Sequence, residues 1–340
     1  MALTIPTTTV KKCSILTPED IEHWMKYGYV VIKSAFTKEQ ADEKMRDLWV
    51  RLGYDPNDKK TWVMDRVNMP SHNQVLCSTF VPKVWQAICD LSGGADRIDE
   101  NSPPSFSDNF ICNFGKDEYI GQEFNPKGLD NWHVDGDFFM HYLDSPEQSM
   151  LIIPLYTDIK PGCGGTVICP GGMEIIAKHL AAHPEGVTPR MVPRGEEPKH
   201  KDLDWFIEKV QQFPKEAFHE MTGNVGDVVL MHPLMLHSAS KNTLRAPRVI
   251  TNPTFRMKEP FKFSRHNPDD YSLIELKTLS FLGVDRFDYQ ITGKREYLNP
   301  TRIEIHARMK EEERLRLAGA LRKGNMEKGY DINRLEGEVF

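Results

Sequence analysis

A histidine and an aspartate two residues apart, His133 and Asp135, have types and spacing that could support metal chemistry. In an extended strand this spacing puts both side chains on one face, roughly 6–7 Å apart along the backbone. An imidazole and a carboxylate placed in this way can bind one metal ion. A second histidine far along the chain, His237, would complete a two-histidine, one-carboxylate set with open coordination positions, which is typical of non-haem Fe(II) sites.

The same His-x-Asp triplet occurs twice, and the flanking sequence distinguishes the two copies. His200 and Asp202 lie in a charged segment, where Asp202 is expected to cap the helix that follows. The first triplet is followed by apolar runs at 150–156 and 166–169 with a Pro-Gly turn between them, a pattern typical of β-strands. A metal site is therefore predicted at His133 and Asp135, and an ordinary helix start at the second triplet.

Two histidines compete for the third ligand position. His232 precedes Pro233 inside an apolar run, which is typical of a histidine packed in a core. His237 lies where the chain turns from apolar to polar, at the start of H-S-A-S-K-N-T. This pattern favours His237 as the ligand.

Other polar residues are candidates for binding small molecules. Asn113 lies in a predicted strand at 107–114, and its amide could either bind a ligand or bond the backbone at a strand end. Arg190 and Arg194 each follow a proline in the long polar segment 183–222 and could reach an anionic substrate. For both arginines, a solvated surface position is the alternative.

Length, charge and cysteine usage limit the class of protein. The chain has 340 residues, a formal net charge of −6 and a pI near 6.1, so nucleic acid is not expected as a partner. No apolar run is long enough to span a membrane or to act as a signal peptide. The six cysteines include no C-x-x-C pair, which favours free thiols and a reduced, cytoplasmic protein. Nothing in the sequence decides for or against a homo-oligomer.

Predicted helices flank the strands and suggest one mainly β domain over 1–340. One helix is predicted at 17–28, and a second from the capping-box residue Thr37 to Gly53. A helical insertion at about 173–222 and a helical C-terminal extension at about 260–340 complete the pattern. The charged helix in that extension, which starts near Thr301, is interpreted as mainly solvent-exposed.

Taken together, four sequence blocks resemble the phytanoyl-CoA dioxygenase-like branch of the Fe(II)/2-oxoglutarate oxygenases. The resemblance covers most of residues 14–256, and the tail beyond about residue 260 lies outside it. The four blocks are L-T-P-E-D-I-E-H-W-M-K-Y-G-Y-V-V-I, W-H-V-D, G-G-T-V-I-C-P-G-G and G-D-V-V-L-M-H-P-L-M-L-H-S-A-S-K-N with a later arginine. One departure is Gly171-Gly172, where relatives usually have Ser-His.

The resemblance implies a fold and a set of binding residues. The implied fold is a double-stranded β-helix, a cupin-like jelly roll of two antiparallel sheets. The implied iron ligands, which are also the catalytic residues, are His133, Asp135 and His237. Arg248 would pair with the distal carboxylate of 2-oxoglutarate through its planar fork, and Thr166 would add a hydroxyl. The implied cofactor is Fe(II), with 2-oxoglutarate and O2 as co-substrates and a small molecule as substrate.

A narrower resemblance and several alternatives concern the substrate. The chain looks like fungal members that tailor polyketides, including those that expand a dearomatised ring to a tropolone after attack on a ring methyl. A simple hydroxylase of another small molecule is the alternative within the family. A halogenase would need the Asp135 position vacated for chloride, a Zn or Mn cupin enzyme would give Arg248 no role, and a non-catalytic jelly-roll binding protein would need no intact triad.

Overall fold

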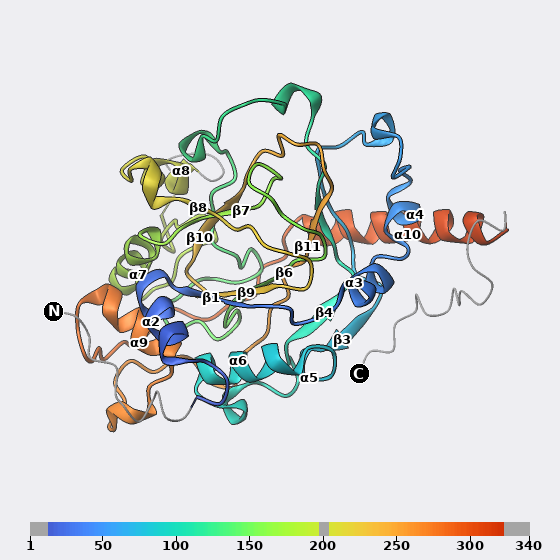
Figure 1. Cartoon of the computed structure of the whole chain (residues 1–340). Helices are drawn as coiled ribbons and strands as arrows, with labels where there is room; N and C mark the ends of the chain where they lie inside the picture. Colours follow the sequence, from blue (N-terminus) through green and yellow to red (C-terminus); the bar gives the residue numbers. More distant parts are fainter. Residues whose placement is uncertain (1–12, 197–203, 323–340) are drawn as a thin grey trace.

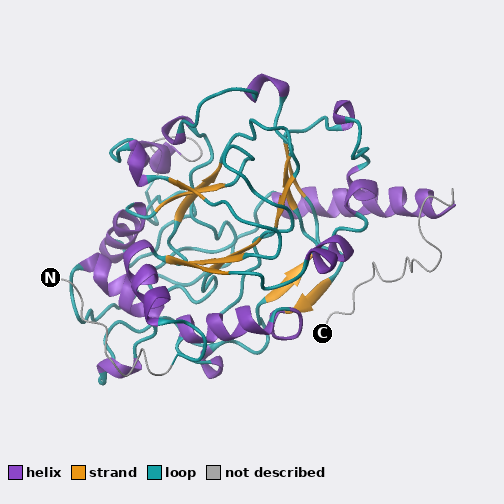
Figure 2. Cartoon of the chain, viewed as in Figure 1, coloured by secondary structure: helices purple, strands orange, loops and turns teal. Residues whose placement is uncertain are grey.

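Short antiparallel strands form the centre of the computed structural model, which describes residues 13–196 and 204–322. Two three-stranded sheets have the orders β1-β9-β6 and β11-β5-β2, a third has the order β10-β7-β8, and β3 pairs with β4. The strands are β1 (Tyr29–Ile32), β2 (Arg66–Asn68), β3 (Gln74–Leu76), β4 (Ser105–Ser107), β5 (Ile111–Asn113), β6 (Leu151–Pro154), β7 (Thr166–Cys169), β8 (His219–Glu220), β9 (Val228–Met231), β10 (Leu236–Ala239) and β11 (Arg248–Ile250). Helices surround these strands (Figure 2).

Single bridges extend the sheets beyond the named strands. Leu155, directly after β6, pairs with Ile250 of β11 and so joins the first two sheets. In the third sheet, His133 pairs with His237 of β10 and extends the sheet by one residue. Among the described residues, strand pairing does not close these sheets into a barrel. The strands β6, β7 and β9 are buried along their whole length, which explains their continuous apolar sequences.

The helices cover the edges of the sheets. They are α2 (Pro18–Tyr27), α3 (Lys38–Lys44), α4 (Leu48–Leu52), α5 (Cys77–Phe80), α6 (Pro82–Ser92), α7 (Gly172–Ala182), α8 (Asp204–Val210), α9 (Leu273–Leu282) and α10 (Arg302–Arg322). In Figure 1, α2, α7 and α9 lie together at one end, and the long α10 runs from the central strands past α4. Among the described residues, no helix has the length and apolarity needed to cross a membrane.

The N-terminal helices confirm one prediction and correct another. The capping box of Thr17 and Asp20 starts α2, and Gly28 ends it in the left-handed conformation with φ of 74°. The single helix predicted from Thr37 to Gly53 is wrong, because the chain breaks between α3 and α4. The separate α4 buries Arg51 beneath α10, a contact that local sequence does not reveal.

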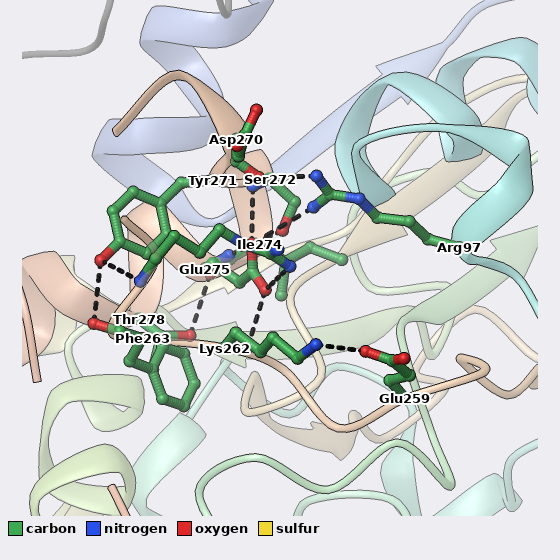
Figure 3. Close-up of polar contacts among 11 residues, drawn as sticks. Arg97, Glu259, Lys262, Phe263, Asp270, Tyr271, Ser272, Ile274, Glu275 and Thr278 are labelled. Atoms are coloured by element: carbon green, nitrogen blue, oxygen red, sulfur yellow. Dashed lines mark hydrogen bonds and ion pairs between the residues drawn. The ribbon is translucent and has the colours of Figure 1, made fainter. Parts of the chain in front are cut away.

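A buried carboxylate fixes the first turn of α9. Glu275 is nearly inaccessible to solvent and accepts hydrogen bonds from Arg265 at 2.7 and 2.9 Å and from the backbone N–H groups of Lys262 and Ser272 (Figure 3). Arg97 approaches it at 3.5 Å from the short 3-10 helix that follows α6. Because each oxygen has partners, the burial of this charge is compensated. The hydrogen bonds of Glu275 therefore hold α9 against the preceding loop, which is a structural role.

Candidate active site

The three residues predicted to bind a metal come together at one backbone bridge. His133 and His237 exchange both backbone hydrogen bonds, at 2.9 and 3.0 Å, and their rings lie 4.3 Å apart between centroids. The Oδ1 atom of Asp135 lies 3.4 Å from Nε2 of His133 and 3.6 Å from Nε2 of His237. One ligand atom from each side chain lies within 4.8 Å of the others, so this group could hold a metal ion.

Backbone carbonyls orient both imidazoles. The Nδ1–H of His133 can donate to the carbonyl of Asn131 at 2.8 Å, and the Nδ1–H of His237 can donate to the carbonyl of Met235 at 2.9 Å. A neutral imidazole that donates through Nδ1 carries its lone pair on Nε2. Both Nε2 atoms face Asp135, which is the tautomer arrangement that a metal site requires.

The electrostatics of the three side chains are coupled. Burial raises the pKa of Asp135, but without a metal a proton on Nε2 of His133 or His237 is donated to this carboxylate, and these hydrogen bonds outweigh burial and hold the pKa of Asp135 well below its usual value. Burial lowers the pKa of His133, and the neighbouring Asp135 more than reverses this effect. The site therefore keeps its carboxylate ionised, as a metal ligand must be.

Asn252 lies directly behind the candidate ligand Asp135. Its Nδ2 group donates to Oδ2 of Asp135 at 3.2 Å, while Oδ1 faces the histidines. We expect Asn252→Ala to weaken binding of a divalent metal about tenfold to a hundredfold, because partners behind a ligand orient it. Titration with Co(II) would measure this. Asn101→Ala, at an exposed loop, should leave the metal affinity unchanged, and equal affinities for both variants would contradict the role of Asn252.

A cavity of about 640 Å³ is lined by the three side chains and by residues of all three larger sheets. Thr166 of β7 lies opposite Ala239 in the β7–β10 register, two residues from His237, so its side chain is on the face that carries the histidine. Thr166 and Arg248 both line the cavity, as the resemblance implied for a co-substrate site.

Arg248 is a buried cation at this cavity, with only 1% of its surface exposed. Two of its N–H groups donate to the carbonyls of Gly164 and Ile111, at 2.7 and 3.0 Å. Within the described part of the chain, no carboxylate lies at ion-pair distance from it. Burial lowers the pKa of its guanidinium to about 10, which still leaves it charged near neutral pH. An unpaired buried charge is costly, and an anion in the cavity would compensate it.

Two predicted site residues do not join this cavity. The Asn113 amide donates to the carbonyls of Gly164 and Ser240 and accepts from the N–H of Gly115, so backbone groups occupy it. This matches the structural alternative rather than the ligand role. Arg190 is exposed and does not line the cavity. Its predicted contact with the substrate stays a prediction without support from this geometry.

His232 and the second His-x-Asp triplet are the sequence alternatives to the chosen metal ligands. His232 is fully buried between Trp24 and Phe281 and bonds Thr278 at 3.0 Å, so its interpretation as a core histidine is confirmed. Burial lowers the pKa of His232 to about 3, which keeps the ring neutral. The second triplet, His200 and Asp202, lies outside the described residues.

Sequence reasoning missed the contribution of the C-terminal helix. Arg302, Ile305, His306 and Met309 of α10 line the cavity. Their spacing of three, four and seven residues was readable as one helix face, but the mixed charges around the helix gave no reason to point that face inward. Asn252 was also missed, because no motif marks it.

Comparison with known proteins assigns the family. A family model described as phytanoyl-CoA dioxygenase (PhyH) matches residues 24–250. No curated protein matches the sequence.

Several solved structures resemble the fold at low identity. They include HygX from Streptomyces hygroscopicus with nickel and 2-oxoglutarate bound (12% identity, 72% of this chain and 88% of that chain, TM-score 0.40) and EvdO2 from Micromonospora carbonacea var. aurantiaca (14%, 73% and 96%, TM-score 0.39). A third is SnoK, a non-haem α-ketoglutarate-dependent carbocyclase from nogalamycin biosynthesis (14%, 72% and 86%, TM-score 0.38). The family model matches two thirds of the chain. The chain therefore belongs to the phytanoyl-CoA dioxygenase family and is a non-haem iron, 2-oxoglutarate-dependent oxygenase that uses Fe(II), 2-oxoglutarate and O2.

Proposed function

We propose that His133, Asp135 and His237 hold the Fe(II) of this oxygenase and that Arg248 binds the distal carboxylate of 2-oxoglutarate. The observation that carries the proposal is the buried Arg248, which has no carboxylate at ion-pair distance among the described residues and lines the same cavity as the triad. Two neutral imidazoles and one carboxylate suit Fe(II) and leave positions open for the co-substrate and O2. Bound there, Fe(II) supplies O2 activation coupled to decarboxylation of 2-oxoglutarate to succinate and CO2.

The residues around the metal position have separate tasks. Asn131 and Met235 hold the imidazoles through their carbonyls, and Asn252 holds Asp135. Arg248 can offer a planar pair of N–H donors to a carboxylate, with Thr166 as a neighbouring hydroxyl donor. Asn113 has no part in the proposal, because backbone groups already use its amide.

Arg248→Gln tests the co-substrate role. We expect its dissociation constant for 2-oxoglutarate to rise at least about tenfold, because a lost charge-assisted bond costs roughly 1.5–3 kcal/mol. Iron binding should be retained, since Arg248 does not touch the triad. The measurement is a 2-oxoglutarate titration of the iron-loaded protein without O2.

Arg245 offers a matched control three residues earlier. It is also buried, but it pairs with Asp117 at 3.2 Å and donates to the carbonyl of Gly115, and it does not line the cavity. Arg245→Gln should therefore change 2-oxoglutarate affinity far less. Equal losses for the two variants would show a general effect of removing a buried arginine and would refute the assignment.

The reaction proposed for this site is oxidation of an aliphatic C–H bond of a small molecule. The narrower proposal is attack on a methyl group of a dearomatised aromatic polyketide, followed by ring expansion to a tropolone, and it rests on the sequence resemblance alone. A product screen with such cyclised polyketides distinguishes the outcomes by mass. Hydroxylation adds one oxygen to the substrate, whereas ring expansion at a ring carbinol removes two hydrogens and adds no oxygen, so the two products differ in mass. NMR of the product then confirms a seven-membered ring or a hydroxymethyl group.

The proposal also includes the fold, the domain extent, the location and the partners of the chain. The bridged sheets β1-β9-β6 and β11-β5-β2 on one side, and β10-β7-β8 with His133 on the other, support a jelly roll with the site between them. A single domain over 1–340, a cytoplasmic location and the absence of nucleic-acid and membrane partners stay predictions. The insertion at about 173–222 holds α7, α8 and β8, and the extension after about 260 holds α9 and α10.

A further inference from the structure

One face of α10 faces both the cavity and the core. Its cavity-lining side chains are Arg302, Ile305, His306 and Met309. Glu313 and Leu317 continue the same face at intervals of four residues, and both are buried. The first two turns of the helix therefore line the cavity, and the following turns pack on the protein core.

The packed half of α10 is fixed by a buried ionic contact. Glu313 and Arg51 each expose only 2% of their side chains, and Nε of Arg51 donates to Oε2 of Glu313 at 2.8 Å. His72 meets the same oxygen at 2.8 Å, and Arg316 donates to the backbone carbonyl of Arg51. The helix therefore has a defined position on α4.

The cavity end of α10 is joined to the chain that carries the candidate ligand Asp135. Arg302 forms a two-bond pair with Asp137, at 2.6 and 2.8 Å. Just before the helix, the N–H of Leu298 donates to the carbonyl of Phe138 at 2.7 Å. Because both contacts are within three residues of Asp135, the helix has a fixed distance from the metal position.

The groups that line the cavity near α10 include exposed apolar side chains together with one guanidinium. Met64 and Ile305 line the cavity and expose 55% and 41% of their surfaces, so apolar area faces the open space. Arg302 also lines it, and a guanidinium offers only donors. This combination fits a molecule with an apolar body and an acceptor oxygen.

We propose that α10 is the substrate-binding wall of the active site, where Arg302 binds an acceptor oxygen of the substrate and Ile305 contacts its apolar body. The inference rests on the proposed function, because it requires the triad and Arg248 to hold iron and 2-oxoglutarate. The helix lies beyond residues 24–250 that match the family model, so this wall belongs to the chain's own tail. It replaces the predicted Arg190 as the source of a substrate-facing cation.

A pair of small probes tests the wall without knowledge of the natural substrate. Acetophenone has a carbonyl group where ethylbenzene has a methylene, and the two are otherwise identical. Their binding to the full chain loaded with Zn(II) and 2-oxoglutarate can be measured by ligand-observed NMR. We expect acetophenone to bind about tenfold more tightly, since a bond from a charged donor has that effect. Arg302→Gln should remove the preference.

Three variants separate direct contact from a structural role. Arg308→Gln makes the same change on α10 at an exposed residue that does not line the cavity, and it should keep the preference. Asp137→Asn weakens the ion pair with Arg302 but leaves the Arg302 guanidinium in place. This variant should therefore also keep the preference for acetophenone. Ile305→Gln should weaken both probes and leave their ratio unchanged.

The outcomes distinguish the two proposals. Absence of 2-oxoglutarate binding by the wild-type, Zn(II)-loaded protein would refute the proposed function before a probe is added. Normal 2-oxoglutarate binding with no acetophenone binding, with equal binding of the two probes, or with the preference intact in Arg302→Gln would overturn the wall alone. Loss of the preference in Asp137→Asn or Arg308→Gln would also overturn it, because the effect would then be structural.

Discussion

Alanine at His133, Asp135 or His237 is expected to abolish both iron retention and 2-oxoglutarate consumption. The three side chains come from two chain segments that meet at a single backbone bridge, and their ligand atoms lie within 4.8 Å of one another. With one of them removed, two ligands remain, and the open site loses the facial geometry that holds Fe(II). Metal analysis after gel filtration and a succinate-release assay would measure the two losses.

His232→Ala is the matched control for this experiment. His232 lies five residues before His237, but it is buried against Trp24 and Phe281 and bonds Thr278 rather than the metal position. We expect this variant to lower the thermal unfolding temperature, because it opens a cavity in the core, and to keep its iron. Loss of iron in His232→Ala together with retention in His237→Ala would reverse the choice of third ligand.

Glu313→Ala is expected to destabilise the protein by about 1.5–3 kcal/mol, because it removes a buried, charge-assisted hydrogen bond of Arg51. The Arg51 guanidinium would lose one of its two carboxylate partners, but it would keep the Asp108 carboxylate at 3.3 Å and its bonds to the carbonyls of Asp108 and Pro70. Urea unfolding of the full chain, followed by tryptophan fluorescence, would measure the change. Because α10 forms part of the cavity, 2-oxoglutarate turnover should also fall at temperatures well below the unfolding midpoint.

The neighbouring Glu312 provides the control. It pairs with Arg316 at 3.1 Å across one helical turn, and its side chain is 63% exposed. Glu312→Ala should change the free energy of unfolding by about 0.5 kcal/mol or less, as exposed pairs do. Replacing Arg51 and Glu313 together by methionine should recover part of the loss, since the Asp108 carboxylate that also pairs with Arg51 keeps its hydrogen bonds from His72 and Asn73. Equal destabilisation by Glu312→Ala and Glu313→Ala would show that the buried contact has no special weight.

The sequence by itself determined the composition of the candidate metal site. His-x-Asp spacing in an extended segment places both side chains on one face whatever the rest of the fold does. The change from apolar to polar residues distinguished His237 from His232, and the core position of His232 is confirmed. Capping boxes and terminal glycines are equally local, which is why the bounds of α2 were predictable. Such features depend on residues a few positions apart.

Only the tertiary structure decided what surrounds that site. The charge pattern of α10 predicted a mainly solvent-exposed helix, and most of its described side chains are exposed. Glu313 is the exception, because it is buried against Arg51, which lies 262 positions earlier. Charged residues that face water and those that form a buried pair are identical in composition, so no local pattern separates them. The same reason applies to Arg302 and Arg190. Both are exposed arginines in polar segments, and only packing placed Arg302 at the rim of the cavity and Arg190 away from it.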